Sequence, residues 1–375
     1  MAQEYTFIVD QKPFASLLAA MQPICTKRTT LDATTYLHIC VGHRELVVKS
    51  TDLEVSLQAS HPLKENNSGE APSFLVSGKR LFDIVRELEG VITFSLTNNQ
   101  LILRSGSVRL SLNIRDAQDF PPFPERIENL IDLDAGLILG MIGKVNFLIP
   151  QNNTNPALNG LYLEITPDAM TMTTTDGHSL AQAGTPRYHL QEPRSWLIPR
   201  RAIFEVKKLL ENSQDRTLFL GMCGNQLVFS GESFNFFTKL LADPFPAYKQ
   251  ILERTGFRGA VVDRSELVKT LRRSSCLLSG QFIATNFGFA SQELNVWMEN
   301  KEVGALAEKL SLANFDGEPV DMRFYAPYLL SGLQVFDEDK VHFSLHNAAK
   351  PIIFESDQSD MHLIYLVMPV CPVSS

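Results

Sequence analysis

The sequence predicts an α+β protein built from three homologous domains, and three observations carry this prediction. The chain has 375 residues, more than one ordinary core supports and suited to two or three domains. One amphipathic helix occurs twice, because Val76 to Leu88 aligns without a gap with Ile198 to Leu210. The neighbouring elements return in the same order with a period of about 125 residues, a comfortable size for one domain.

The first domain is expected over residues 1–126. It opens with an amphipathic helix from Asp10 to Ile24, for which Asp10 is a candidate cap. A second helix follows from Ser77 to Leu88, and the proline-rich run from Asp116 to Arg126 closes the domain. Alternating apolar residues predict strands at Tyr36 to Val41, Glu45 to Lys49, Val91 to Leu96, Gln100 to Arg104 and Arg109 to Ile114.

The second domain, residues 127–252, repeats this order, and the third, residues 253–375, repeats it more faintly. Thr175-Asp176 stands where Thr51-Asp52 stood, and NQLVFSG from Asn225 repeats NQLILRSG from Asn99. Helices are expected at Asp134 to Phe147, Pro199 to Leu210, Asp263 to Leu278 and Phe324 to Phe336. Strands are expected at Leu161 to Ile165, Met170 to Thr174, Leu294 to Met298, Val341 to Leu345, Ile352 to Glu355 and Met361 to Met368.

Composition narrows the class of protein. A formal net charge of -8 argues against a protein that coats nucleic acid indiscriminately. Five scattered cysteines without a Cys-x-x-Cys pair favour free thiols in a reducing compartment over disulfides or a zinc site. The N-terminus lacks the order of a signal peptide, and the longest apolar stretch, Ala135 to Pro150, is too short to span a bilayer. We expect a soluble cytoplasmic protein with no membrane partner and no cofactor.

Positive charge recurs on the predicted helices. In the aligned helix Lys79 falls on Arg201 and Arg86 on Lys208, and in the third domain the first helix supplies the cations instead. Spaced cations without interleaved aromatic residues suit contact with phosphate rather than base reading or single-strand stacking. The candidate DNA-contacting residues on these helices are Lys79, Arg80, Arg86, Arg200, Arg201, Lys207, Lys208, Lys269, Arg272 and Arg273.

The string Thr175-Asp176-Gly177-His178 is the most enzyme-like feature. Asp176 and His178 could form an acid–base or metal pair, but no further ligand lies at the spacing that metal sites need. Asp-Gly after a strand is first a turn signal, and the first domain has Thr51-Asp52-Leu53-Glu54 in the same place. P-loop, dinucleotide and nucleophile-elbow motifs are absent. We therefore predict an architectural turn and no catalytic residue, with a hydrolase as the weaker alternative.

Several apolar groups fall at loops and chain ends of the second and third domains. They are Leu158, Leu180, Pro246, Ile251 and the run from Leu366 to Val370, with His178 beside them. Two interpretations are open: ordinary packing between domains, or a groove for the apolar anchors of a bound peptide.

The same residues carry a resemblance to a known family. TDLE at Thr51, SGKRLFDIVREL, ALNG at Ala157, TDGHSL, IPRRAIFEVKKLL, FPAYKQIL and the terminal YLVMP occur in order along essentially the whole chain. Together they resemble the bacterial sliding clamps, the beta subunits of DNA polymerase III. The match is specific in the second domain, and in the third it lies mainly at the end.

The resemblance implies a homodimeric ring of six similar DNA-clamp domains, with helices lining the interior and antiparallel sheets outside. Such a ring encircles double-stranded DNA and tethers the polymerase, and it is opened by an ATP-using clamp loader while itself hydrolysing nothing. It implies DNA contact by Arg28 and the basic helices. Polymerases, loader and repair proteins would insert short linear motifs into a pocket of Leu158, Thr175, Gly177, His178, Ser179, Leu180, Pro246, Ile251, Ala349, Pro351, Leu366, Val367, Met368, Pro369 and Val370.

This chain departs from the family pattern at several positions. Ser179 stands where the family often has Arg, Gln250 replaces another frequent cation, and the loop before Leu158 lacks an aromatic pair near DNA. The tail also continues from Cys371 to Ser375 beyond the usual end. The alternative function is a repeat-built scaffold that binds proteins through the same groove without encircling DNA.

Overall fold

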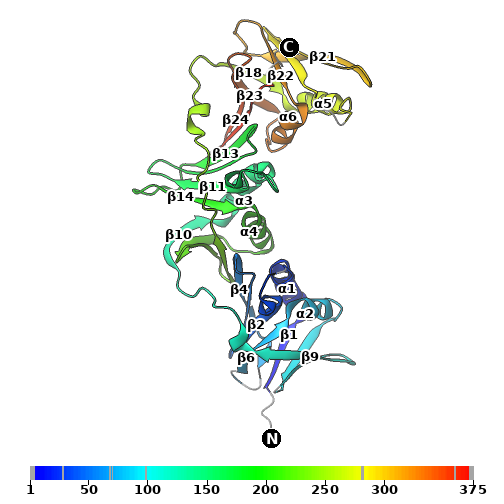
Figure 1. Ribbon diagram of the computed structural model, residues 1–375, viewed down its shortest axis with the longest axis vertical. Coiled ribbons are helices and arrows are strands. Elements are labelled where there is room, and N and C mark those ends of the chain that lie inside the picture. Colours follow the sequence, from blue (N-terminus) through cyan, green and yellow to red (C-terminus); the bar gives the residue numbers. More distant parts are fainter. Residues whose placement is uncertain are drawn as a thin grey trace. The chain divides into compact units, whose positions relative to one another are not determined.

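The computed structural model of the chain describes residues 5–370 apart from residues 28, 67, 68, 70, 98, 280–282 and 359. It divides into two compact units. Unit 1 consists of Met1–Leu137 and Phe204–Leu240, and unit 2 of Ile138–Ile203 and Leu241–Ser375. Figure 1 shows helices and arrows labelled as below, and each unit is described by itself.

Over the first predicted domain the strands and helices alternate in a regular order. They are β1 Tyr5–Asp10, α1 Gln11–Cys25, β2 Tyr36–Val41, β3 Glu45–Thr51, β4 Val55–Pro62, β5 Glu65–Asn66, β6 Ala71–Ser77, α2 Gly78–Val85, β7 Val91–Leu96, β8 Gln100–Ser105 and β9 Val108–Asp116.

The same order follows over the second and third predicted domains. In the second they are β10 Glu128–Asp134, α3 Ala135–Val145, β11 Gly160–Ile165, β12 Met170–Thr175, β13 Ser179–Thr185, β14 Arg194–Pro199, α4 Arg200–Asn212, β15 Thr217–Cys223, β16 Gln226–Ser230 and β17 Phe234–Lys239. In the third they are β18 Arg258–Asp263, α5 Arg264–Ser275, β19 Thr285–Ala290, β20 Glu293–Asn300, β21 Gly304–Ala313, β22 Val320–Phe324, α6 Ala326–Leu333, β23 Lys340–Leu345, β24 Ile352–Asp357 and β25 His362–Val367.

The described strands reveal a shorter repeat than the sequence indicated. Apart from β5, they form groups of four antiparallel strands in which a strand, a helix and a three-strand meander follow one another. The strand before each helix pairs with the first strand of a meander, as β1 does with β7 and β6 with β2. Each predicted domain therefore holds two copies of one βαβββ unit, whose six leading strands the alternation analysis did not predict.

Helix starts follow the same repeat. Asp10, Asp134 and Asp263 each end a strand directly before the first helix of a domain. The carboxylates of Asp134 and Asp263 accept hydrogen bonds from the backbone N–H groups of Leu137 (2.8 Å) and Glu266 (2.9 Å), as helix caps do. The predicted cap at Asp10 is wrong, because its carboxylate makes no cap bond and accepts instead from Lys64 Nζ at 3.1 Å.

Each unit contains one continuous antiparallel sheet with helices packed on it. In unit 1 the strand order is β10-β15-β16-β17-β4-β3-β2-β6-β9-β8-β7-β1-β5, and in unit 2 it is β14-β11-β12-β13-β25-β24-β23-β18-β21-β20-β19-β22. Figure 1 shows α1 beside α2 and α5 beside α6, and each pair is in contact. The predicted helix Ser77–Leu88 is shorter than expected, so that Arg86 caps the C-terminal end of α2 instead of lying within it.

Two strand pairings join one predicted domain to the next. We call them the β4–β17 seam, in unit 1, and the β13–β25 seam, in unit 2. In the first, Val55 to Ala59 lie opposite Thr238 to Phe234, and in the second, Ser179 to Gly184 lie opposite Val367 to His362. Both seams join the last strand of one meander to the last strand of another, so the two domain junctions are built in the same way.

Candidate functional site

The TDGH string forms a tight turn between β12 and β13. The Asp176 carboxylate accepts hydrogen bonds from the backbone N–H groups of His178 (2.8 Å) and Ser179 (2.7 Å). The Thr175 hydroxyl accepts from the N–H of Gly177 (3.1 Å) and donates to the carbonyl of Ser179 (2.6 Å). Gly177 has a φ of 93°, which glycine adopts without steric cost, and so allows the turn to close.

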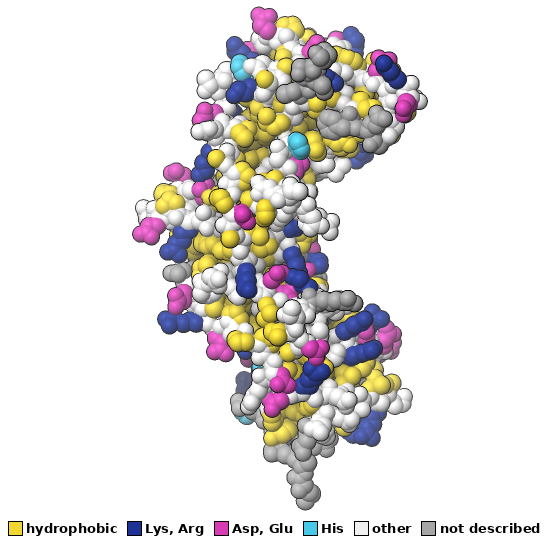
Figure 2. Space-filling model, in the orientation of Figure 1, with side chains coloured by type: hydrophobic (Ala, Val, Ile, Leu, Met, Phe, Trp, Pro, Cys, Tyr) yellow, Lys and Arg dark blue, Asp and Glu magenta, His cyan; other side chains and the backbone are white. Residues whose placement is uncertain are grey.

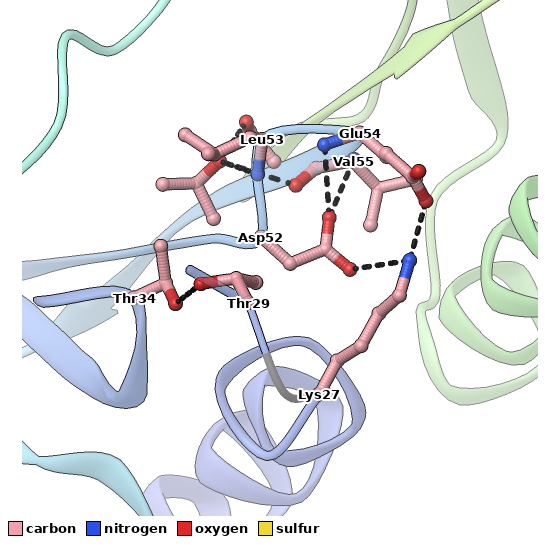
Figure 3. Close-up of polar contacts among 9 residues, drawn as sticks. Lys27, Thr29, Thr34, Asp52, Leu53, Glu54 and Val55 are labelled. Atoms are coloured by element: carbon pink, nitrogen blue, oxygen red, sulfur yellow. Dashed lines mark hydrogen bonds and ion pairs between the residues drawn. The ribbon is translucent and has the colours of Figure 1, made fainter. Parts of the chain in front are cut away.

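The first domain builds the same turn with different residues. Figure 3 shows the Asp52 carboxylate accepting from the N–H groups of Glu54 (3.0 Å) and Val55 (2.9 Å), with Lys27 Nζ 3.6 Å away. Lys27 also pairs with Glu54, which occupies the position of His178. These matching bonds confirm that both strings form the predicted turn. Among the described residues, no group of three or more His, Cys, Asp or Glu side chains could hold a metal ion.

The turn stands at one end of the β13–β25 seam. Leu180 lies opposite Leu366, and Met368 donates a backbone hydrogen bond to the carbonyl of His178 at 2.9 Å. Leu180 and Leu366 are almost fully buried in a cluster with Tyr248, Ile353 and Ile364. Leu180 and Leu366 were predicted to pack between domains or to line a peptide groove, and the structure shows both packed in this buried cluster, which we call the floor.

Exposed apolar groups lie around this floor. Ile251 is 42% exposed and Met368 is 37% exposed, so both present apolar area to water. Ile251 is next to Leu252, which packs against the cluster, and Met368 follows Leu366 by two residues. Of the other predicted peptide-binding residues, Leu158, Thr175, Ser179, Pro351 and Val367 are buried, Pro246, Pro369 and Val370 are half-buried, and Gly177, His178 and Ala349 are exposed.

Three aromatic residues at or beneath this surface were missed by the sequence interpretation. The ring of His178 stacks on Tyr328 of α6 at 5.5 Å between centroids, and Tyr325 meets Tyr328 edge-on at 5.1 Å. Tyr248 joins the floor cluster from the segment that links the two domains. No sequence signal identifies Tyr328, because only the tertiary packing of α6 brings it against a turn far away in the chain.

The predicted DNA-contacting cations differ in how they are held. Arg200 donates to the carbonyl of Ile149, and Arg273 is paired with Glu308. Arg86, Lys207 and Lys208 each have a carboxylate within 4 Å on or beside their own helix, and Arg201 is half-buried. Arg28 lies outside the described residues. Lys79, Arg80, Lys269 and Arg272 are exposed and, within the described part of the chain, make no ion pair.

The four exposed cations lie on helix surfaces in both units. Lys79 and Arg80 begin α2, and Lys269 and Arg272 lie one turn apart on α5. Figure 2 shows several Lys and Arg side chains gathered around α1 and α2 with acidic groups among them. These groups are available to a polyanion without first breaking an internal ion pair.

Comparison with known proteins follows the domain order. Models of the DNA polymerase III beta subunit match over 5–124 for its N-terminal domain, 132–247 for its central domain and 249–371 for its C-terminal domain. Curated relatives called beta sliding clamp include one from Pseudomonas putida, 26% identical and covering 97% of this chain and 99% of its own. Another, from Vibrio cholerae, is 28% identical and covers 92% and 93%.

Solved structures share the fold over nearly the full length. A Pseudomonas aeruginosa sliding clamp bound to griselimycin has a TM-score of 0.90 at 23% identity, covering 99% of this chain and 100% of its own. A Bartonella birtlesii sliding clamp, also bound to griselimycin, has a TM-score of 0.88 at 24% identity with the same coverage. With all three domain models matched in order, this chain belongs to the family of DNA polymerase III beta subunits.

Proposed function

We propose that this chain is a DNA sliding clamp, a processivity factor that encircles duplex DNA as a homodimeric ring and tethers the replicative polymerase and other partners. Its family and the name shared by its relatives support this function. The observation that carries the ring itself is a pair of open strand edges. Each open edge belongs to the last strand of a meander, as do the strands that pair in the two seams inside the chain.

The open edges belong to β9 in unit 1 and β21 in unit 2. Each seam joins the last strand of the earlier meander in one domain, β4 or β13, to the last strand of the later meander in the next, β17 or β25. The remaining strands of these two types are β21 and β9. Residues 108–113 of β9 pair only with β8, and residues 304–311 of β21 pair only with β20, within the described chain.

Pairing β21 of one chain with β9 of another would repeat the internal seam. Doing so twice joins two chains through two identical contacts and leaves neither strand edge open, as closed symmetric assemblies require. Both strands are mostly exposed, and β9 carries Val108 (43% exposed) and Leu110 (37% exposed). An exposed strand edge of this length is otherwise an aggregation hazard, which favours a partner strand in solution.

The DNA contact is proposed to be electrostatic and independent of sequence. The exposed cations Lys79, Arg80, Lys269 and Arg272 suit phosphate contact, and a net charge of -8 for the chain keeps such contacts local. Weak contacts suit sliding, because a closed ring is retained by topology rather than by affinity. In this role the chain acts in the cytoplasm as a non-catalytic accessory factor, and a clamp loader supplies the energy for opening.

Partner proteins are proposed to bind the surface around Leu180, Leu366, Ile251 and Met368. Apolar side chains of a short linear motif would cover Ile251 and Met368 and rest on the buried floor. Griselimycin, which is bound to two relatives, is proposed to occupy the same surface here. Ser179 is buried in β13 and leaves this rim without the cation that the family often has at this position.

Solution mass over a concentration series tests the ring. A dimer of chains of 42.0 kDa has a mass of 84.0 kDa, and its small-angle scattering should show a hollow particle that persists on dilution. Retention on circular but not on linear DNA, after loading, distinguishes a clamp from a protein-binding scaffold. A compact monomer at all concentrations would contradict the ring and favour the scaffold.

A further inference from the structure

We infer that the segment Asp243 to Phe257, here called the strap, is held at two points so that it positions Pro246 and Ile251 for partner recognition. The inference rests on the proposed peptide surface and names the residues that preorganise it. The strap lies in unit 2, follows β17 and leads into β18. It supplies two of the predicted peptide-binding residues, and several of its other side chains contact strands of the sheet.

The first attachment is to strands on the β13 side of the seam. The phenol of Tyr248 lies 3.1 Å from Gln182 Nε2 and 3.3 Å from the Thr173 hydroxyl, and Gln182 Nε2 also donates to Thr173 at 2.8 Å. The phenol oxygen accepts both bonds, and burial, which raises the pKa of Tyr248 above its usual value, keeps water away from them. Next to it, Lys249 pairs with Glu164 of β11 at 2.9 Å.

Aromatic packing reinforces this attachment. Phe245 stacks on Tyr162 of β11 with centroids 5.0 Å apart and planes 5° from parallel, and Tyr248 meets both rings edge-on. Pro246 lies between Phe245 and Tyr248 and lines a hollow of about 320 Å³ formed with Tyr162 and Glu164. The position of Pro246 is therefore fixed by groups on either side of it.

The second attachment is to a strand on the β25 side. Arg254 pairs with Glu355 of β24, and the two side chains are only 33% and 26% exposed. Leu252 and Phe257 also pack against the cluster that contains Leu180 and Leu366. The strap thus crosses the β13–β25 seam with one end held to each side.

Ile251 lies between the two attachments on the 3₁₀ turn Lys249–Leu252. Its N–H donates to the carbonyl of Tyr248 at 2.9 Å, and its side chain is exposed. Within the described chain, Leu252 of this turn packs against the buried cluster and Ile251 does not, so the attachments on both sides of Ile251 determine where its side chain points. If the attachments were lost, only a fraction of the molecules would present Ile251 correctly, and the apparent affinity would be the intrinsic affinity multiplied by that fraction.

The test measures griselimycin binding by titration calorimetry with the full-length chain. Tyr248→Phe removes one hydroxyl and Arg254→Gln removes one ion pair, and each is expected to weaken binding about 3-fold, the double variant about 10-fold. Lys64→Gln, which breaks an exposed ion pair with Asp10 in unit 1, is the matched control and should bind as the wild type does. The charge exchange Arg254→Glu with Glu355→Arg should restore most of the affinity lost in Arg254→Gln.

A double-mutant cycle with Ile251→Ala separates positioning from general loss of structure. If the attachments act through Ile251, breaking them in the Ile251→Ala background should cost less than in the wild type. Full additivity of these effects would overturn the positioning role, as would wild-type affinity in the double variant. Failure of the wild type to bind griselimycin, or unchanged binding by Met368→Glu, would instead contradict the proposed peptide surface.

Discussion

Ser111 provides the sharpest test of the ring, because its position in β9 can be compared with the internal seam. The N–H of Ile114 donates to the carbonyl of Asn99, next to the start of β8, at 3.2 Å. The backbone N–H of Ile114 therefore points to the edge of β9 that faces β8. Orientation alternates along an antiparallel strand, which turns the N–H groups of Arg109, Ser111 and Asn113 toward the open edge. Ser111→Pro therefore removes an outward donor and leaves the pairing with β8 intact.

The size of the effect follows from the seam already formed within the chain. The aligned motifs NQLILRSG and NQLVFSG place Ser111 where Phe237 stands in β17, and Phe237 lies opposite Ser56 across the β4–β17 seam. A lost backbone hydrogen bond costs about 1 kcal/mol net, and the ring would contain two such seams. We expect the dimer to lose about 2 kcal/mol, or about a 30-fold rise in its dissociation constant.

Sedimentation over a dilution series measures this constant, with Ser111→Ala as the matched control because alanine keeps the N–H group. Circular dichroism should show that both variants stay folded, since proline is tolerated on a strand edge whose N–H faces outward. Equal dissociation constants for the two folded variants would refute the assignment of β9 to the subunit contact.

Three further predictions address the turn, the DNA surface and a buried thiol. Asp52→Ala should lower the free energy of unfolding, measured by urea titration, by about 3 kcal/mol, because the N–H groups of Glu54 and Val55 lose a buried, charged acceptor. A loss below about 0.5 kcal/mol would contradict this. Replacing Lys79 and Arg80 by Ala should reduce the slope of log affinity for duplex DNA against log salt by about 2 per chain, whereas an unchanged slope would remove α2 from the DNA surface. Burial raises the pKa of Cys25 to about 11, so at pH 8 Cys25 should react with a thiol reagent far more slowly than the exposed Cys276, and comparable rates would refute this. Because the unfolded chain loses this proton at lower pH than the folded chain, the free energy of unfolding should also fall as pH rises from 9 toward 11.

The sequence by itself determined the repeat, the helices and the turns. The gapless alignment of Val76–Leu88 with Ile198–Leu210 depends on local spacing, and helices at α2 and α4 follow from it. The Thr-Asp turns were equally predictable, because the bonds that close them run from Asp52 and Asp176 to backbone groups two and three residues away. Helices and turns can be predicted in this way because their hydrogen bonds join residues only a few positions apart.

The sequence did not reveal the βαβββ repeat within each domain or the strand with which each βαβββ unit begins. β10 (ENLIDLD) and β14 (RSWLIP) contain consecutive apolar residues in place of regular alternation, and they pair with β15 and β11. Strand formation at such places is decided by the partner that supplies hydrogen bonds, which a periodicity within one segment does not reveal.

The candidate site shows the same division. Leu180 and Leu366 were identified as apolar groups in conspicuous places, but only the antiparallel register of β13 and β25 makes them neighbours on one floor. The stacking of His178 on Tyr328 and the attachment of Tyr248 to Gln182 likewise join residues distant in the chain. The sequence determined which groups were available, and tertiary packing decided which of them meet, because contact across a seam depends on register and not on local pattern.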